Sequence, residues 1–254
     1  MSENAFFSDY PRFYATSQTS AIPDRLNCRY QSIIQANQNI IAGKRLLDIG
    51  SHDGRWTFAA LQAGAQHVTG IEPRAELIDN AVSNMQAYGI DESSYAFIKD
   101  DVFNFLRSHT NEIDVVLCLG YFYHTIQHVE LVKLMAGTQA RHIILDTEVF
   151  PTNTPYHSSP TPRQLKERSA REDNFVIQLI KDPVAQEMMA TEDAFTEDGM
   201  TIVGRPSVGA IHFIFEHFGF EVQEIDWDTL LAQSAEGLND YQEGWRKTFL
   251  CSRK

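Results

Sequence analysis

The 254-residue sequence is short of positive charge and of cysteine, and each shortage excludes classes of protein. Lysine and arginine total 21 against 34 aspartate and glutamate residues, which gives a formal net charge of −13. This charge opposes nonspecific attraction to nucleic-acid phosphates and to anionic membrane surfaces, so a small-molecule partner is favoured. The three cysteines, Cys28, Cys118 and Cys251, are far apart and form no Cys-x-x-Cys pair. They indicate reduced core thiols and a cytoplasmic location.

Long apolar runs and two common enzyme motifs are also missing. No apolar run is long enough to span a bilayer, and the first ten residues have neither a basic start nor a continuous apolar core, so we expect neither export nor membrane insertion. The sequence contains no Gly-x-Ser-x-Gly and no Gly-Lys-Ser/Thr loop, which removes the usual hydrolase and phosphate-loop interpretations. Its 43% hydrophobic content suits one large α/β domain with a buried core.

The most informative segment is 45–61, which predicts a strand, a glycine turn and a helix. Gly50 and Gly54 let the backbone turn tightly against a ligand, and the helix points its N-terminal amides at the same place. The next apolar strand ends at Glu72, where a carboxylate can accept both hydroxyls of a ribose. A dinucleotide loop reads Gly-x-Gly-x-x-Gly, but His52 and Arg55 stand at two of those positions. The turn therefore favours a nucleoside without a pyrophosphate.

Asp48-x-Gly50-x-x-x-Gly54, with Glu72 at the next strand end, resembles motif I and the following acidic position of class I S-adenosylmethionine-dependent methyltransferases. The resemblance covers most of the chain and implies S-adenosylmethionine as cofactor. It departs from the family at His52, where glycine is common. An acid after the third strand reaches the adenine amine in that family, and Asp101, with Asp100 as second choice, matches it. The implied cofactor-binding residues are Asp48, Gly50, Ser51, His52, Gly54, Glu72, Pro73, Asp100, Asp101, Val102 and Gly120. The alternative is an αβ unit whose glycines only permit packing.

The resemblance also implies the fold, an α/β Rossmann-like sheet of seven strands in the order 3-2-1-4-5-7-6. Apolar segments predict these strands near 45–49, 67–71, 95–99, 113–119, 141–147, 220–227 and 245–252. We divide the chain into an N-terminal lid and helix (1–41), a cofactor-binding half (42–150), a cap insertion (151–205) and a C-terminal half (206–254). Amphipathic stretches at 164–171 and 183–189 predict that the insertion is a helical cap, with a mobile linker as the alternative.

Candidate catalytic residues follow the fourth and fifth strands, because sites in open α/β sheets gather at the carboxyl ends of strands. Tyr123 and His124 are suited to orient a nucleophile or take its proton, although His124 can instead cap the next helix. Glu148 is expected to polarise His124 or bind an amine, and Asp146 to be a buried acceptor. His124 and His128 are four residues apart, but Thr125 stands where a zinc helix has glutamate, so no metal site is predicted.

Further contacts are expected from the flanking segments, with a packing or surface role as the alternative for each. The candidates for the cofactor carboxylate are Tyr14, Arg25 and Arg29, and those for the substrate are His157, Arg163 and Arg205.

Together these features predict a cytoplasmic methyltransferase that acts on an O, N or C nucleophile of a small molecule by direct in-line transfer. The first alternative is a transferase that uses carboxy-S-adenosylmethionine on tRNA. Segments 119–124 and 145–149 are similar to tRNA uridine carboxymethyltransferases, a resemblance that places Tyr123, and less surely Arg205, near the extra carboxylate. The net charge argues against it. The second alternative is a noncatalytic nucleoside-binding regulator, because fold alone does not establish catalysis.

Overall fold

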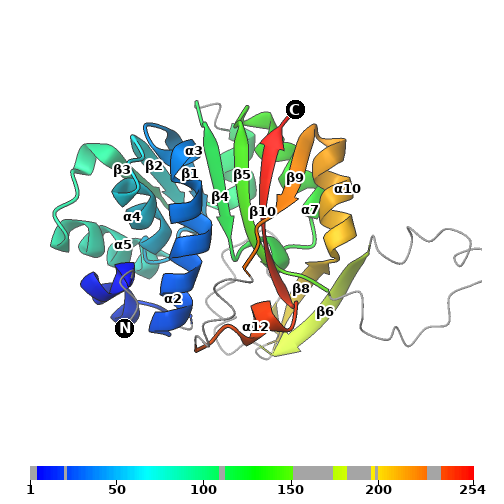
Figure 1. Ribbon diagram of the computed structural model, residues 1–254, viewed down its shortest axis with the longest axis horizontal. Helices are drawn as coiled ribbons and strands as arrows, with labels where there is room; N and C mark the ends of the chain where they lie inside the picture. Colours follow the sequence, from blue (N-terminus) through cyan, green and yellow to red (C-terminus); the bar gives the residue numbers. More distant parts are fainter. Residues whose placement is uncertain are drawn as a thin grey trace, which may run out of the picture.

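The computed structural model describes residues 5–19, 22–108, 112–150, 174–181, 196–197, 200–227 and 236–254. A seven-stranded sheet forms its centre, in the order β3-β2-β1-β4-β5-β10-β9 (Figure 1). Its strands are β1 (Arg45–Ile49), β2 (His67–Ile71), β3 (Tyr95–Ile98), β4 (Val115–Leu119), β5 (His142–Glu148), β9 (Phe220–Glu224) and β10 (Arg246–Arg253). The first five are parallel, and β10 runs antiparallel to both β5 and β9. The predicted order 3-2-1-4-5-7-6 is confirmed, with β9 and β10 as the sixth and seventh strands.

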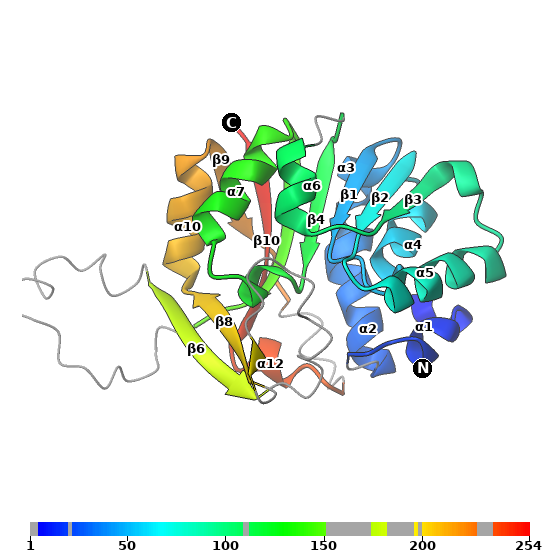
Figure 2. The same ribbon diagram turned by 180° about the vertical axis from the view of Figure 1, so that it is seen from behind.

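Helices cover both faces of this sheet. The α-helices are α1 (Arg12–Ala15), α2 (Pro23–Arg29), α3 (Gln38–Ile41), α4 (Arg55–Gln62), α5 (Ala75–Ala87), α6 (Val102–Ser108), α7 (His128–Gly137), α10 (Val208–His217) and α12 (Asn239–Gln242). Segments of 3-10 or π-helix are η1 (Phe6–Asp9), η2 (Tyr30–Ile34), η3 (Gln35–Asn37), η4 (Glu92–Ser94) and η5 (Phe122–His124). Helices α6, α7 and α10 lie on one face (Figure 2), and the segment from α2 to α3 lies on the other with α4.

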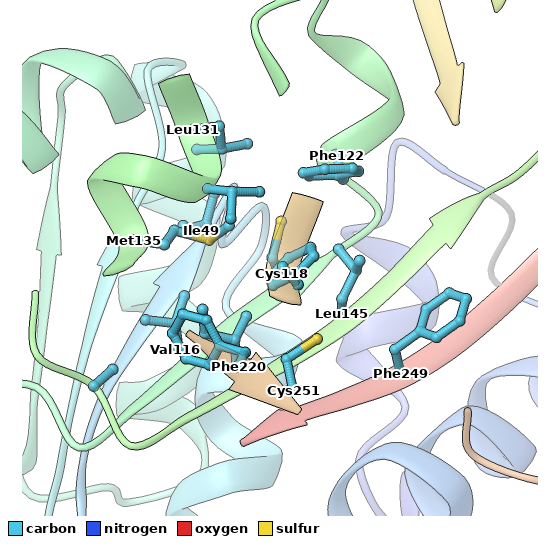
Figure 3. Close-up of a cluster of buried hydrophobic side chains, with 14 of the residues drawn as sticks. Ile49, Val116, Cys118, Phe122, Leu131, Met135, Leu145, Phe220, Phe249 and Cys251 are labelled. Carbon is cyan, nitrogen blue, oxygen red and sulfur yellow. The ribbon is translucent and has the colours of Figure 1, made fainter. Parts of the chain in front are cut away.

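Each face has its own hydrophobic core. On the side of α7 and α10, buried residues of β1, β4, β5 and β10 pack against both helices (Figure 3). Cys118 and Cys251 lie within this core as free thiols, and Cys28 is also buried and free. Because successive strand residues point to opposite faces, the apolar runs of the central strands supply both cores at once. This packing fixes the strand ends that carry the polar residues.

The N-terminal aromatic residues belong to the hydrophobic core on the other face of the sheet, the face that α4 covers. Phe7 and Phe13 are fully buried, and their rings contact Trp56 and Phe58 of α4 at centroid separations of 5.9 and 5.2 Å. The aromatic part of this segment is therefore packed against α4. The following residue Thr16 reaches the glycine turn, where its hydroxyl donates to Asp53 at 2.7 Å.

The described part of the insertion is β structure. Strands β6 (Phe175–Lys181), β7 (Thr196–Glu197) and β8 (Met200–Pro206) form a second, antiparallel sheet in the order β6-β8-β7. The helical-cap prediction is wrong for these residues, because the short, mostly apolar run at 175–180 and the β-branched residues of 201–203 favour extended backbone. The helices expected at 164–171 and 183–189 lie outside the described residues.

Candidate functional site

A cavity of about 400 Å³ lies at the carboxyl ends of β1, β2, β4 and β5. It is lined by Gln18, Thr19, Arg25, Arg29, Gly50, His52, Arg55, Trp56, Glu72, Pro73, Arg74, Leu119, Gly120, Tyr121, Tyr123, His124, Glu148, Thr201, Asp240 and Arg246. Eight predicted site residues are among them. Six others are not: Asp48, Ser51, Gly54, Asp100, Asp101 and Val102.

The glycine turn between β1 and α4 has the backbone form that its sequence predicts. Gly50 and Gly54 have φ values of +66° and +79°, and His52 adopts +54° despite its side chain. A side chain at Gly54 would meet Phe97 at 2.9 Å, so this glycine permits close packing behind the turn. Gly50 faces the cavity, where Tyr121 lies 3.4 Å from the place of a side-chain carbon.

Orphaned polar atoms gather around this turn. Among the described residues, the buried side-chain atoms without a hydrogen-bond partner are Arg29 Nε, Asp48 Oδ1, Ser51 Oγ and His52 Nε2. Buried polar groups normally have partners, and three of these four atoms lie within five consecutive residues. An incomplete hydrogen-bond network at this turn is the property expected of a ligand site.

Glu72 lies at the end of β2 with 1% of its surface exposed. Its carboxylate accepts hydrogen bonds from the backbone nitrogen of His52 at 3.1 Å and from Arg74 Nε at 2.7 Å. The first contact ties the acid to the glycine turn. The second shows that Arg74, which also lines the cavity, neutralises the carboxylate.

Asp53 and Arg55 stabilise the far side of the turn. Arg55 Nε lies 2.7 Å from Asp53 Oδ1, and the His52 ring is 3.3 Å from the same oxygen. Burial by itself raises the pKa of Asp53, but the charges of Arg55 and His52 outweigh it and leave the pKa lowered. Asp53 is therefore an ionised anchor that fixes the two side chains facing the cavity.

Asp48 is buried beneath the turn, and its side-chain partner is a hydroxyl group, whereas that of Asp53 is an arginine. Its Oδ2 accepts from the Thr57 hydroxyl at 2.8 Å. Burial raises the pKa of Asp48 to about 7, and Glu72 and Asp53 add to the effect. The acid supports the turn from behind, and its role in cofactor binding stays a prediction.

The acids after β3 are engaged at the start of α6. Asp101 Oδ1 accepts from the backbone nitrogen of Phe103 at 2.8 Å, in the manner of a helix cap. Asp100 accepts from the backbone nitrogen of Asp101 at 2.8 Å. Adenine recognition by Asp101, Asp100 or Val102 stays a prediction.

The turn η5 after β4 brings Tyr123 and His124 into the cavity. Their rings lie 4.1 Å apart between centroids, and the His124 backbone nitrogen donates to Tyr121 at 2.8 Å. Burial raises the pKa of the Tyr123 hydroxyl, while hydrogen bonding to Arg246 opposes the rise. Tyr123 is therefore a neutral hydrogen-bonding group at neutral pH.

Glu148 and Arg205 form an ion pair at the same rim. Arg205 Nη2 lies 2.6 Å from Glu148 Oε2, and Arg205 Nε donates to that oxygen at 2.7 Å. The pair joins β5 to β8, so the insertion is linked to the cavity. Polarisation of His124 by Glu148 stays a prediction.

Asp146 is the centre of a buried polar network behind the cavity. Its Oδ1 accepts from Arg29 at 2.9 Å and from Arg246 at 2.7 Å. Its Oδ2 accepts from the hydroxyls of Tyr241 at 2.6 Å and Thr248 at 2.8 Å. Burial would raise the pKa of Asp146, but the two arginines outweigh burial and lower it. The prediction of a buried acceptor is confirmed.

Several cavity residues have no counterpart among the predicted ones. They are Gln18, Thr19, Arg55, Trp56, Arg74, Thr201, Asp240 and Arg246. Arg246 pairs in register with Glu148 across the β5–β10 ladder. The sequence of β10, in which Lys247 and Arg253 are also charged, gave no signal that singles out Arg246. Asp240 holds Arg25 through two contacts, at 2.6 and 2.7 Å.

The remaining predicted contacts have mixed outcomes. Arg25 and Arg29 line the cavity, whereas Tyr14 accepts from Asn27 at 3.3 Å and is not among the cavity residues. His128 lies on Gly204, with its Nε2 3.0 Å from that carbonyl oxygen, and is buried away from the cavity. His157 and Arg163 lie outside the described residues. Within the described ranges no helix is long and apolar enough to cross a membrane, and no group of three metal-binding side chains occurs.

Part of the chain, from β1 to β4, matches a known protein family. Residues 46–140 match the family described as a methyltransferase domain. The ribosomal RNA large subunit methyltransferase I of Klebsiella pneumoniae is 34% identical over 77 residues, which are 30% of this chain and 19% of that protein. The same enzyme of Yersinia pseudotuberculosis is 34% identical over 74 residues, 29% of this chain and 19% of its own length. The matched region therefore spans about a fifth of these curated relatives.

Solved structures match over more of the chain and at lower identity. The magnesium protoporphyrin IX methyltransferase of Synechocystis PCC 6803, solved with bound SAH (S-adenosylhomocysteine), has a TM-score of 0.56 and 15% identity, covering 99% of this chain and 95% of that one. An S-adenosylmethionine-dependent methyltransferase of Mesorhizobium loti has a TM-score of 0.60 and 14% identity, covering 89% and 98%. At these identities the likeness establishes the shared fold.

Proposed function

We propose that this chain is a class I S-adenosylmethionine-dependent methyltransferase that transfers a methyl group to an O, N or C nucleophile of a small molecule. The methyltransferase-domain match over residues 46–140 and the shared fold support the proposal. The observation that carries the proposal is the glycine turn, where Glu72 accepts from the His52 backbone nitrogen and the buried side chains of Asp48, Ser51 and His52 each keep one atom without a partner. The buried, unbridged cysteines agree with a reducing, cytoplasmic compartment.

The cavity residues suggest how the cofactor is held. Glu72 accepts the ribose hydroxyls, and Gly50 and Gly120 allow the methionine part to pass close to the backbone. Arg29 lies with its guanidinium 4.9 Å above the Trp56 ring, beside the start of α4, and is the candidate for the methionine carboxylate. Its orphaned Nε fits this role, because carboxylates are strong acceptors for guanidinium groups.

Positioning is expected to supply most of the catalysis, because the sulfonium already activates the methyl group. The acceptor's lone pair forms the new bond to the methyl carbon as the carbon–sulfur bond breaks, and the acceptor's proton leaves to a base or to water. His124 is the candidate base, and the neutral Tyr123 hydroxyl is suited to orient the nucleophile. Arg205 and Glu148 hold the neighbouring rim in place.

The tRNA carboxymethyltransferase alternative keeps one supporting observation, because Tyr123 and Arg246 adjoin each other in the cavity and suit an extra carboxylate. The names of the curated relatives also keep a nucleic acid open as acceptor. The net charge of −13 favours the small molecule. A noncatalytic regulator would keep the same cavity and lack turnover.

Two measurements test the proposal. Calorimetry should detect binding of S-adenosylmethionine and S-adenosylhomocysteine but not of NAD, and tight binding of NAD alone would contradict the cofactor assignment. Transfer from labelled S-adenosylmethionine to a metabolite extract, and from carboxy-S-adenosylmethionine to total tRNA, each followed by mass spectrometry, then separates the alternatives. A methylated metabolite supports the proposal. A carboxymethylated tRNA, or cofactor binding without transfer to either pool, supports one of the other two functions.

A further inference from the structure

Glu72 accepts as many hydrogen bonds as a carboxylate can take. Its Oε1 accepts from the Arg74 backbone nitrogen at 3.2 Å and from Arg74 Nε at 2.7 Å. Its Oε2 accepts from the His52 backbone nitrogen at 3.1 Å and from Arg74 Nη2 at 3.3 Å. An ionised carboxylate has about four lone-pair positions, two on each oxygen, and these donors fill them. The two hydroxyls of a ribose therefore need positions that other donors already hold.

The four donors of Glu72 are of two kinds. The two backbone donors, one on each oxygen, are fixed by the fold of the glycine turn and of the residues that follow β2. The other two belong to the Arg74 side chain, which holds both oxygens in a parallel fork. This side chain is 17% exposed, whereas that of Glu72 is 1% exposed. Rotation of the Arg74 side chain frees one position on each oxygen, as many as the 2′- and 3′-hydroxyls require.

The Arg74 guanidinium has a second acceptor within reach. Its third nitrogen, Nη1, donates to Gln18 Oε1 at 3.5 Å, and both side chains line the cavity. Gln18 belongs to the N-terminal segment, which is attached to the glycine turn by the hydrogen bond from Thr16 to Asp53. A guanidinium that leaves Glu72 for Gln18 therefore stays bound to the protein, and its positive charge stays near the carboxylate.

We propose that Arg74 occupies the ribose subsite and is displaced by the cofactor, whose two hydroxyls replace the guanidinium on Glu72 while Arg74 turns to Gln18. The inference rests on the proposed function and adds a specificity-determining residue to its cofactor site. The exchange is one for one, because each oxygen of Glu72 loses one N–H donor and gains one O–H donor. A nucleoside without these hydroxyls has no donor to offer Glu72, so it leaves Arg74 in place.

Calorimetry with S-adenosylhomocysteine tests the competition. Arg74→Gln should bind this ligand about fivefold more tightly than wild type, because the ribose no longer competes with the guanidinium. Arg107→Gln is the matched control, because it makes the same substitution in an exposed pair with Glu130 outside the cavity, and it should bind within about twofold of wild type. Arg74→Lys keeps the charge but cannot form the fork, so it should also bind more tightly, and it serves if Arg74→Gln fails to fold.

NMR follows the displacement directly in the wild-type protein. The Arg74 Nε–H signal, identified by its absence in Arg74→Lys, should shift when adenosine saturates the cavity and stay in place with 2′,3′-dideoxyadenosine. Equal or weaker binding of S-adenosylhomocysteine in the Arg74 variants overturns the inference, and so does an Nε–H signal that responds equally to both nucleosides. Failure of the proposed function is distinguishable, because the wild-type protein would then not bind S-adenosylhomocysteine at all.

Discussion

Replacement of Asp146 by asparagine tests the buried network on which the site is built. Asp146 is fully buried and accepts four hydrogen bonds, two of them from arginines. Asparagine keeps the shape and removes the charge, so Arg29 and Arg246 would lie in the interior without a counter-ion. The change also turns one acceptor atom into a donor that faces existing donors.

The size of the effect follows from comparison with measured buried pairs. Removing one partner of a buried ion pair costs about 3–5 kcal/mol, because the remaining charge is uncompensated. A typical domain has a free energy of unfolding of about 5–15 kcal/mol, so the variant should lie near the limit of stability. The pKa of Asp146 is lowered in the folded state, so its contribution is complete above the unfolded value near 4 and is lost as the pH falls further. The loss in Asp146→Asn should therefore be constant between pH 5 and pH 8.

Urea denaturation followed by circular dichroism measures this loss as a shift in midpoint at unchanged slope. Glu224→Gln is the control, because it breaks a half-exposed pair with Lys247 on the neighbouring strands and should cost less than about 1 kcal/mol. A loss of under 1 kcal/mol in Asp146→Asn would refute the view that two arginines depend on this carboxylate.

Three further predictions concern the cavity and the insertion. Glu72→Ala should weaken S-adenosylhomocysteine binding by about 1–3 kcal/mol in calorimetry, whereas the exposed Glu76→Ala should not; equal affinities would place the ribose elsewhere. His124→Ala should leave cofactor affinity unchanged and lower turnover. If His124 is a base, turnover should fall by about a hundredfold and the acid limb of the pH profile should flatten. Wild-type turnover at every pH would show that His124 is not part of the active site. Gly204→Val should lower the thermal midpoint, because a side-chain carbon there would lie 2.4 Å from the His128 ring, and an unchanged midpoint would contradict that packing.

The sequence was sufficient for the parts of the fold that depend on short-range patterns. Strands β1 and β2 occupy 45–49 and 67–71 as predicted, because apolar runs between glycines and polar residues mark both ends. The positive φ angles of Gly50 and Gly54 follow from the same local signals. The acid at position 72 lies beside the turn because parallel strands bring their carboxyl ends to one edge.

Long-range pairing was beyond what the sequence could predict. Asp146 meets Arg29 and Arg246 across 117 and 100 residues, and nothing near any of the three residues indicates its partners. Arg74 was equally hidden, because its contact with Glu72 depends on side-chain direction after the strand. In the insertion, the short apolar run at 175–180 is compatible with a strand, but the neighbouring amphipathic stretches favoured helices.

Asp48 is the counterpart of Asp146, because both carboxylates are fully buried and only one is paired with cations. Burial raises the pKa of Asp48 to about 7, whereas its unfolded value is near 4. An acid whose pKa is raised on folding makes the protein less stable as the pH rises between those two values. Wild-type protein should therefore lose stability at Asp48 over a pH range in which Asp146 contributes a constant amount.

Asp48→Asn removes this titration while keeping an acceptor for the Thr57 hydroxyl, which lies 2.8 Å from Oδ2. The amide also places a donor where Oδ1 has no partner, a cost that does not depend on pH. Relative to wild type, the variant should gain about 3 kcal/mol in free energy of unfolding between pH 5 and pH 8, since each pKa unit corresponds to about 1.4 kcal/mol. Urea denaturation at pH 5 and pH 8 measures the gain. Asp146→Asn is the control, because its difference from wild type in free energy of unfolding should be the same at both pH values. If the Asp48→Asn difference is also the same at both values, Asp48 does not titrate between pH 5 and pH 8, and a folded-state pKa of about 7 is refuted.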